Sequence, residues 1–465
     1  MNTKPFILTI FGASGDLAKL KLFPSLYALA EKGQLPQEFY ILGYARTPKT
    51  DGEFKKEFTD SIKSAHKTNP QILESLAKNV HYVTGQYDNL NDFKNLKNKI
   101  KTLSKKPLPH LAYFSVPPVA FQDIIKNLGE TKTSNEDIRL ILEKPFGQDT
   151  ESATELFHYV ARYFHEEEVY LLDHYLGKSG VQSILTLRHN NRLINQMMKG
   201  PKIANIQITA AEDIGVENRI GYFDQVGTIK DMFQSHLLQI LALITMSIPI
   251  TENHESLHRE KYSILSALKF IESPKNIVLG QYKSYTSQKG VPKDSTTETF
   301  AALQLFIDRE SWYKKPIYLR TGKRLNEKHT YVVVELKKFA FQSKDQEPNR
   351  LIFELQPEEK ISITLVNKRG SSYKYQQITT SESLACEGDD CLPEHANLLL
   401  DVLRKKRLHF LSFQEIIASW AITDKIVHFI RKNNLKPEKY ADGSPGPSKQ
   451  NHLTEIDKFS WFDPH

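Results

Sequence analysis

The stretch FILTIFGASGDLA, residues 6–18, decides the fold of the first part of this chain. Residues 6–11 form a continuous apolar run of the length expected for a buried strand. A glycine-containing turn follows at once, and an apolar helical pattern begins behind it with Leu22, Leu26 and Leu29. Glycines at such a turn let the backbone approach a pyrophosphate, which free N–H groups at the helix N-terminus can bind. The spacing G-x-x-G-x-x-A is less specific than G-x-G-x-x-G, so an ordinary strand-to-helix turn is the alternative.

The region up to residue 173 repeats this alternation of strands and helices. Further apolar runs have strand character, with helical patterns between most of them: residues 39–44, 81–83, 111–116, 139–142 and 169–172. Strands that alternate with helices predict a parallel, doubly wound sheet of the Rossmann type. The glycine turn follows the very first strand of this pattern, which favours dinucleotide binding over an ordinary turn.

The second strand indicates which dinucleotide is bound. It ends in GYAR, residues 43–46. An NAD-selective site would place an acidic residue there to bind the ribose hydroxyls, whereas Arg46 offers a guanidinium to a 2′-phosphate. We therefore predict NADP as the cofactor. The residues predicted to bind it are Gly12, Ala13, Ser14, Gly15, Asp16, Leu17 and Arg46.

The pattern changes after Asp173. Alternating strand-like runs follow with few helices between them, at residues 203–210, 300–306, 331–337, 351–356 and 361–366. They predict one large, mostly antiparallel sheet, with helices such as 228–245 and 398–404 covering one face. The expected fold class is therefore α/β plus α+β, with domains at residues 1–173 and 174–465. The Pro-, Gly- and Ser-rich tail from Lys436 is predicted to be an irregular surface segment.

Composition and charge exclude several classes of protein. At 465 residues the chain exceeds the size of one hydrophobic core, and no apolar run is long enough to span a membrane. The formal charge of +7 fits nucleic acid or anionic phosphates equally well. The most basic stretch, residues 91–106, has apolar residues at helical spacing, which predicts an amphipathic helix with solvated lysines. We expect no nucleic-acid partner and no membrane partner.

The two cysteines, Cys386 and Cys391, lie close together in a Gly- and Asp-rich stretch. No other soft ligand lies near them, so the case for a metal site is weak and we predict none. Nothing in the sequence indicates a disulfide framework. We therefore expect a reduced, cytoplasmic protein.

Two later segments carry polar groups suited to a phosphorylated substrate. EKPFG, residues 143–147, puts Lys144 at the carboxyl end of a predicted parallel strand, where open α/β sheets bind ligands. The alternative is an exposed lysine before a turn-forming proline. DHYLGK, residues 173–178, follows the last strand of the alternating region and groups histidine, tyrosine and lysine as donors for a phosphate dianion.

A third segment, residues 221–239, is predicted to be a helix that carries His236. This histidine falls on an otherwise apolar row with Met232 and Ile240. A buried histidine in such a row is either a core residue or a general base that a carboxylate orients, and Asp173 is the candidate carboxylate. Thr228 is predicted to be an N-cap, so the structural alternative to a functional role for Asp231 is the acid of a capping box.

Together these strings resemble the glucose-6-phosphate dehydrogenase family. The match extends from Phe11 to GSPGP at residues 443–447, and includes YVTGQYD at 82–88, LRTGK at 319–323 and LLLD at 398–401. The resemblance implies oxidation of β-D-glucose 6-phosphate to the 6-phosphogluconolactone with hydride transfer to NADP, the first step of the oxidative pentose phosphate pathway. It also implies homodimers or homotetramers that form through the large sheet.

The resemblance assigns roles to individual residues. It implies that His236 removes the proton of the anomeric hydroxyl and that Asp173 stabilises the resulting imidazolium. It places Lys144 between the sugar and the nicotinamide, and so beside both substrate and cofactor. The residues implied to contact substrate are Lys144, His174, Tyr175, Lys178, Glu212, Asp231, Lys323 and Lys328, and Gln356 matches a further position near the substrate.

The sequence also departs from the family, and two other functions are open. Ser179 and Ser235 stand where the family has Glu and Asn, beside the phosphate and base positions, so rate or affinity could differ. One alternative is a related dehydrogenase of the glucose–fructose oxidoreductase superfamily, which shares the EKP string and acts on another sugar. The other is a non-catalytic NADP or sugar-phosphate sensor. DHYLGK favours a 6-phosphate, and the retained base and carboxylate argue against a sensor.

Overall fold

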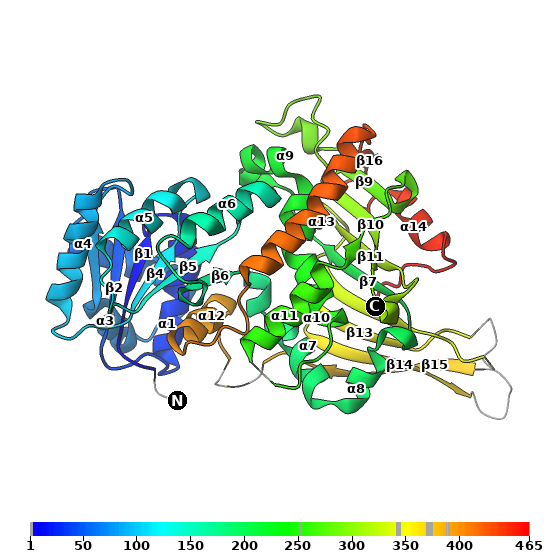
Figure 1. The fold of residues 1–465 in the computed structure, drawn as a ribbon, viewed down its shortest axis with the longest axis horizontal. Helices are drawn as coiled ribbons and strands as arrows, with labels where there is room; N and C mark the ends of the chain where they lie inside the picture. The colour runs from blue at the N-terminus through cyan, green and yellow to red at the C-terminus, as the bar shows by residue number, and fades with distance from the viewer. Residues whose placement is uncertain are drawn as a thin grey trace. The chain divides into compact units, whose positions relative to one another are not determined.

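The computed structural model describes residues 3–251, 253–340, 346–368, 375–386, 388 and 391–464, and the chain divides into two compact units (Figure 1). The first unit comprises Met1–Lys178 and Cys386–Ile416, and the second comprises Ser179–Ala385 and Ile417–His465. The predicted boundary at residue 173 assigned the segment 386–416 to the second domain. In the structure this segment packs within the first unit, because helix α12 (Glu394–Leu403) buries its apolar side chains in that unit's core.

A six-stranded sheet forms the centre of the first unit. Its order is β3-β2-β1-β4-β5-β6, and every neighbouring pair is parallel. The predicted Rossmann-type sheet is therefore confirmed. The strand order reverses between β1 and β4, the point outside which such sheets bind ligands. The strands are β1 (Phe6–Phe11), β2 (Phe39–Ala45), β3 (Val80–Thr84), β4 (His110–Phe114), β5 (Ile138–Glu143) and β6 (Val169–Leu172).

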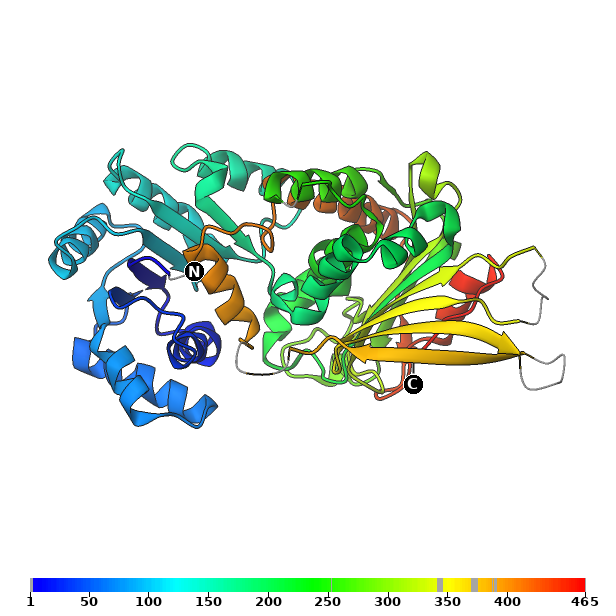
Figure 2. The same cartoon turned by 90° about the horizontal axis from the view of Figure 1, so that it is seen from below.

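Helices cover both faces of this sheet (Figure 2). Successive strand side chains point to opposite faces, so Phe6, Leu8 and Ile10 meet one helical layer while Phe11 meets the other. The first layer contains α1 (Phe23–Glu31), α2 (Asp51–Ala65), α3 (Pro70–Lys78) and α12. The second contains α4 (Leu90–Leu103) and α5 (Phe121–Thr131), with α6 (Thr150–Val160) beside α5. Helix α4 is the predicted basic amphipathic helix, with Phe93 and Leu96 buried.

A large mixed sheet forms the second unit. Its order is β15-β14-β13-β12-β7-β11-β10-β9-β16, and β8 also pairs with β10. The pairs β7–β11 and β9–β16 are parallel and the others antiparallel, which confirms the predicted mostly antiparallel sheet. The strands are β7 (Ile203–Ala211), β8 (Leu268–Lys269), β9 (Ile277–Tyr282), β10 (Phe300–Ile307), β11 (Ile317–Gly322), β12 (His329–Leu336), β13 (Arg350–Gln356), β14 (Lys360–Lys368), β15 (Tyr375–Ser383) and β16 (Glu438–Tyr440).

Helices cover one face of the large sheet, as predicted (Figure 2). The predicted covering helix 398–404 is not among them, because it belongs to α12, which packs in the core of the first unit. The predicted helix 228–245 comprises the end of α9, the π-helical segment η7 and α10. Every residue of α10 is buried. The helices of this unit are α7 (Ser179–Asn190), α8 (Arg192–Met197), α9 (Ile220–Thr228), η7 (Ile229–Leu237), α10 (Leu238–Thr245), α11 (His254–Leu265), most of α13 (Phe413–Lys432) and α14 (Asn451–Glu455).

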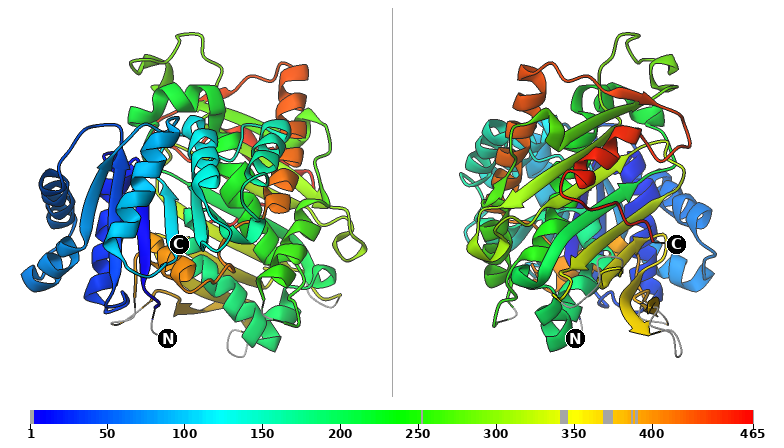
Figure 3. Two further views of the ribbon diagram at one scale, coloured as in Figure 1. Left: turned by 60° about the vertical axis from the view of Figure 1, so that its left-hand side comes forward. Right: turned by 90° about the vertical axis from the view of Figure 1, so that its right-hand side faces the viewer.

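The C-terminal tail differs from the prediction of an irregular surface segment. Residues 438–440 form β16, which pairs with β9, and Tyr440 is buried in the core of the unit. Helix α14 and the chain after it lie beside the large sheet (Figure 3). Helix α14 buries Leu453, and Trp461 packs against Tyr318 of the sheet. Proline and glycine predicted irregular backbone, but the aromatic residues of the tail bury apolar surface.

The cysteines also differ from the prediction. Cys386 and Cys391 form a disulfide, so the expectation that both are reduced is wrong. Their Cα atoms lie 5.6 Å apart, within the range that a disulfide requires. Among the described helices, none combines the length and the apolar composition needed to cross a membrane.

Candidate active site

The glycine turn has the closed geometry that the sequence predicts. Gly12 follows β1 with a φ of 80°, and a Cβ on it would lie 2.1 Å from the backbone oxygen of Ser115. Its N–H donates to the oxygen of Tyr44 at 2.8 Å, and the N–H of Gly15 donates back to the Gly12 oxygen at 2.9 Å. Helical structure begins at Asp16. Only glycine fits position 12, and the turn lies at the carboxyl end of the sheet, where a pyrophosphate binds in this class of fold.

Arg46 is the first residue after β2 and is exposed. Since β2 runs parallel to β1, Arg46 and the glycine turn lie at the same edge of the sheet. The guanidinium carbon of Arg46 lies 5.7 Å from the centre of the Tyr87 ring. Burial raises the pKa of the Tyr87 hydroxyl, while the Arg46 charge and a hydrogen bond with the Gly12 backbone oppose that rise. Tyr87 therefore lies between the two predicted binding elements, although the YVTGQYD string that contains it was given no role in cofactor binding.

Lys144 follows β5 at this same edge. It is partly buried, and its neighbour Glu143 accepts a hydrogen bond from the Tyr113 hydroxyl. The His395 ring nitrogen Nε2 lies 3.5 Å from the Glu143 carboxylate. Glu143 therefore has two partners in the first unit, Tyr113 and His395. Lys144 lies at the carboxyl end of the parallel strand β5, as predicted.

The DHYLGK segment follows β6 and folds into a short 3₁₀ turn, His174–Gly177. The Asp173 carboxylate accepts the backbone N–H of Tyr175 at 2.9 Å and so holds the start of that turn. The Lys178 amino group lies 4.1 Å from the centre of the Tyr175 ring, and the His174 ring packs edge-on against the same ring at 5.0 Å. Two of the three predicted phosphate donors, His174 and Lys178, thus pack against the ring of the third, Tyr175. Asp173 is 1 % exposed.

His236 lies in the π-helical segment η7 and is 1 % exposed. Its predicted neighbours in the row, Met232 and Ile240, are buried as well. A π-helix has i→i+5 hydrogen bonds and is frequent at functional sites. Asp231 of the same segment is also buried.

The predicted capping box at the start of this segment is wrong. Thr228 has helical φ and ψ angles and its side chain makes no cap. Instead the side-chain carboxylate of Glu298 accepts a hydrogen bond from the N–H of Ile229 at 3.2 Å. The backbone oxygen of Glu298 accepts one from the N–H of Thr228 at 3.1 Å. Gly227 has a φ of 69°, and a Cβ there would lie 2.3 Å from the Glu298 carboxylate. The left-handed glycine turns the chain so that a distant residue caps η7.

Glu298 is partly buried and lines a cavity of about 410 Å³ together with Lys230 and Arg431. Burial raises the pKa of its carboxyl group to about 7, although its hydrogen bonds and these two cations oppose the rise. Sequence reasoning missed this residue, because no local pattern relates it to a helix that begins nearly seventy residues earlier.

An acid–lysine cluster lies at the carboxyl ends of β7 and β11. Glu212 follows β7 and Lys323 follows β11, and the parallel pairing of these strands brings the two residues to one edge. The Lys323 amino group lies 2.5 Å from the Glu212 carboxylate and 3.9 Å from that of Asp231. The exposed Arg219 lies 3.5 Å from Asp231. The structure therefore unites three of the predicted substrate residues, whereas Lys328 is exposed and outside this cluster.

The two residues that depart from the family pattern have local partners in the second unit. The Ser179 hydroxyl donates to the carboxylate of Glu359. The Ser235 hydroxyl donates to the backbone oxygen of Asp231 at 3.3 Å within the π-helical segment. Both serines are thus accommodated by hydrogen bonds. Gln356, the further position near the substrate, ends β13 and pairs with Thr330.

Comparisons with known families cover almost the whole chain. The family model described as glucose-6-phosphate dehydrogenase, NAD binding domain, matches residues 9–183. The model described as glucose-6-phosphate dehydrogenase, C-terminal domain, matches residues 185–462.

Individual proteins are similar over the same length. The cytoplasmic glucose-6-phosphate 1-dehydrogenase 5 of Arabidopsis thaliana is 36 % identical, over 97 % of this chain and 91 % of its own. The chloroplastic glucose-6-phosphate 1-dehydrogenase 3 of the same plant is 35 % identical, over 98 % and 80 %. A solved structure of glucose-6-phosphate dehydrogenase in complex with its substrate glucose-6-phosphate is 30 % identical, covers 100 % of both chains and has a TM-score of 0.93.

Proposed function

The chain belongs to the glucose-6-phosphate dehydrogenase family, and from that premise we propose that it oxidises glucose 6-phosphate to 6-phosphoglucono-1,5-lactone with NADP as hydride acceptor. The observation that carries the proposal is the match of both family domains along nearly the whole chain. The grouping of His174, Tyr175 and Lys178 supports a phosphate ester as substrate.

His236 is proposed as the general base. A dehydrogenase must remove the hydroxyl proton as hydride leaves the same carbon, and a desolvated imidazole is suited to this task. Burial of His236 in an apolar row supports the role. Asp173 is proposed to orient the ring and to stabilise the imidazolium, which a buried carboxylate does well because few water dipoles compete with it.

The other polar groups are proposed to bind and position the sugar phosphate. His174, Tyr175 and Lys178 would hold the 6-phosphate. Glu212, Asp231 and Lys323 combine acceptors and a donor, which suits the sugar hydroxyls, and their mutual pairing keeps them oriented before substrate arrives. Lys144 would lie between sugar and nicotinamide. Lys328 is proposed as a further contact from the family pattern alone.

NADP is proposed to lie on the glycine turn and Arg46. Bound NADP supplies the hydride acceptor of the reaction. The residues fit such a ligand, since Gly12 has no room for a side chain and Arg46 stands at the same edge of the sheet. Gly12, Ala13, Ser14, Gly15, Asp16 and Leu17 would hold the pyrophosphate. Arg46 would pair with the 2′-phosphate, and Tyr87 supports the orientation of its guanidinium.

The remaining assignments follow the family. We propose that the first unit binds NADP and carries the 6-phosphate donors, and that the second unit contributes contacts to the sugar hydroxyls and the dimer or tetramer contacts. We propose a place in the oxidative pentose phosphate pathway and a cytoplasmic location. The disulfide bears on the location, since disulfides are rare in a reducing cytoplasm. Thiol labelling of freshly lysed cells, with and without prior reduction, tests whether it is formed there.

The first experiment measures reduction of NADP by absorbance with glucose 6-phosphate, for the wild type and for His236→Asn. We expect turnover by the wild type and a loss of about 10²–10⁴-fold in kcat for the variant, with glucose 6-phosphate binding retained by calorimetry. No turnover by a folded wild type that binds NADP would contradict the proposal. Binding of glucose 6-phosphate without turnover would then favour a sensor, and turnover of another sugar phosphate would favour a related dehydrogenase.

A second experiment tests the cofactor. Arg46→Ala should weaken NADP by about 10–100-fold, as expected for loss of a charge-assisted contact of roughly 1.5–3 kcal/mol, and leave NAD nearly unchanged. Arg162→Ala is a matched control, because Arg162 is also exposed in the first unit and stacks 5.5 Å from a tyrosine ring. Equal losses for NADP and NAD would remove the basis for assigning NADP.

A further inference from the structure

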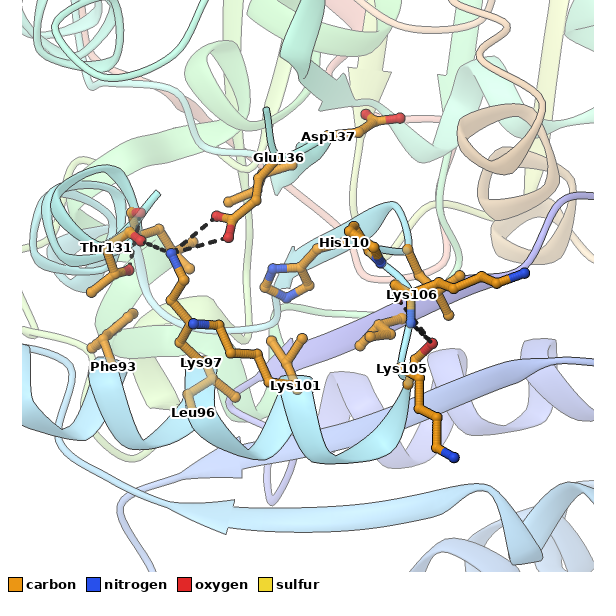
Figure 4. Close-up of a pocket in the computed structure, with 17 residues that line it drawn as sticks. Phe93, Leu96, Lys97, Lys101, Lys105, Lys106, His110, Thr131, Glu136 and Asp137 are labelled. Carbon is orange, nitrogen blue, oxygen red and sulfur yellow. Dashed lines mark hydrogen bonds and ion pairs between the residues drawn. The ribbon is translucent and has the colours of Figure 1, made fainter. Parts of the chain in front are cut away.

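A cavity in the first unit lies apart from the glycine turn and the other site residues described above. This cavity has a volume of about 280 Å³ and opens between α4, α5 and the loop that follows α4 (Figure 4). Ile7, His110 and Ile138 line it, and they stand at or near the first residues of β1, β4 and β5. The cavity therefore lies at the amino-terminal edge of the parallel sheet, whereas the glycine turn and Lys144 lie at the carboxyl edge.

The floor of the cavity is apolar. Phe93, Leu96 and Ile100 face it from α4, and Leu128 faces it from α5. These residues lie on the inner sides of the two helices, and Phe93, Leu96 and Leu128 are buried. A hollow lined by such groups and open at one side binds an aliphatic chain or a small ring, because burial of the ligand removes apolar surface from water.

His110 is the polar group in the middle of this lining (Figure 4). Its Nε2 atom lies 2.8 Å from the hydroxyl of Thr9, which is fully buried. Among the described residues this hydroxyl has no other hydrogen-bond partner, so donation to Nε2 is the arrangement that satisfies its proton. The Nδ1 atom then carries the ring hydrogen and is a donor. Burial lowers the pKa of this imidazole to about 4, so the ring is neutral near pH 7.

The mouth of the cavity carries an excess of positive charge. The acidic groups there are already paired, since the Lys97 amino group lies 3.0 Å from Glu136, and Asp137 pairs with Arg139 at 2.8 Å. Lys101, Lys105 and Lys106 are exposed on the lining, and none of them has an ion-pair partner in the part of the chain that the structure describes. An anion at the mouth would therefore meet uncompensated ammonium groups.

We propose that this cavity is a binding site for a medium-chain aliphatic carboxylate, with the chain on the α4–α5 floor and the carboxylate between His110 and the lysines of the mouth. A neutral N–H donor and nearby ammonium groups favour an anionic acceptor over an alcohol or an amine. The small volume favours a short chain over a long one.

Calorimetric titration of the full-length protein with octanoate tests the proposal. We expect saturable binding at one site per chain. Octanol, which keeps the chain and loses the charge, should bind at least about tenfold more weakly, and octylamine should not bind measurably. Equal binding of octanol would overturn the carboxylate assignment, and absence of saturable octanoate binding would overturn the site. The measurement needs no turnover, so its outcome is independent of the proposed reaction.

Two variants place the binding in this cavity. Lys101→Glu reverses one charge of the mouth and should weaken octanoate by about five- to tenfold. Lys63→Glu is the matched control, since Lys63 is an exposed lysine of α2 in the same unit and does not line the cavity. His110→Phe keeps a ring but removes the donor, and should weaken octanoate more than octanol. If His110→Phe does not fold, Lys101→Glu decides alone, and an equal loss in Lys63→Glu would show that binding is not at this site.

Discussion

The glycine turn and the acid–lysine cluster are built in opposite ways. The turn consists of six consecutive residues, 12–17, whose shape depends on one backbone conformation at Gly12 and on the close approach of the backbone at Tyr44 and Ser115. The cluster joins Glu212, Asp231 and Lys323, which come from a strand end, a π-helix and another strand end. The first depends on local backbone geometry, and the second depends on charges that the fold brings together.

The difference predicts how each region fails. A turn that admits only glycine should fail by steric conflict, which is insensitive to charge and to pH. Removal of one residue from a cluster of paired charges should destabilise the protein, because it leaves a buried carboxylate without a cation. Three substitutions test this contrast, and a fourth tests Glu298, which caps the π-helical segment that carries Asp231.

The largest effect is expected for Gly12→Ala. The left-handed backbone and the contact with Ser115 together predict a cost of about 3–4 kcal/mol, which is a loss of about 100-fold or more in NADP affinity. Gly33→Ala is the matched control, because Gly33 has a φ of 61° but nothing within 4 Å of its Cβ position. It should cost only about 1 kcal/mol of stability and leave NADP binding unchanged. Similar NADP losses in both variants would show that the loss reflects general destabilisation of the unit and not the conflict at Gly12.

The next effect is expected for Lys323→Met. The substitution leaves Glu212 and Asp231 without their shared cation, so we expect a loss of about 3 kcal/mol in the free energy of unfolding and a KM for glucose 6-phosphate about 10-fold higher. Chemical denaturation and steady-state kinetics measure both. Lys328→Met is the control, since Lys328 is exposed. It should leave stability unchanged, and a rise in KM alone would support its proposed substrate contact. An unchanged Lys323→Met protein would show that the cluster is not held by this charge.

A pH-dependent effect is expected for Glu298→Gln. The folded-state pKa of about 7 lies above the ordinary glutamate value, so the folded state binds more protons than the unfolded state in the window below pH 7. Wild-type stability from this group is therefore present at low pH and is lost as pH rises through 7. Glutamine keeps an acceptor for the Ile229 N–H and does not ionise, so the Tm of the variant relative to wild type should rise between pH 5 and pH 8.

Glu310→Gln, which changes an exposed glutamate of the same unit, is the control and should show no such trend. A difference between Glu298→Gln and wild type that is constant across this range would contradict the titration of Glu298. Loss of kcat in Glu298→Ala with retention in Glu298→Gln would support its place as the cap that positions η7.

The smallest effect is expected for Arg219→Ala. The Arg219 side chain is 61 % exposed, and solvent screens its attraction to Asp231. We expect less than about 1 kcal/mol in stability and less than about a threefold change in KM. A larger rise in KM that added salt does not reduce would show that Arg219 contacts the substrate directly.

Several features of the site were open to prediction from sequence because each has a local signal. The turn at Gly12 combines glycine spacing with a preceding apolar run, and DHYLGK places its donors within one short turn. The row of Met232, His236 and Ile240 follows helical periodicity and is buried as predicted. Glu298 had no such signal, and the string that contains Tyr87 did not indicate its role, because the partners of these residues are distant in the chain or are backbone groups.

The sequence by itself determined the alternation of strands and helices, the glycine turn and the nature of both sheets. These three features depend on hydrophobic periodicity and on the backbone freedom of glycine, and both can be read from residues that are close together in the sequence. Only the tertiary structure decided that α12 packs in the first unit, that Cys386 bonds to Cys391, and that Glu298 caps the helix of His236. These depend on which surfaces meet after the chain folds. The sequence around α12 and around Glu298 does not indicate these partners, because topology and the apolar area that each contact buries decide them. Cys386 and Cys391 are five residues apart, so their closeness was visible in the sequence but their bond was not.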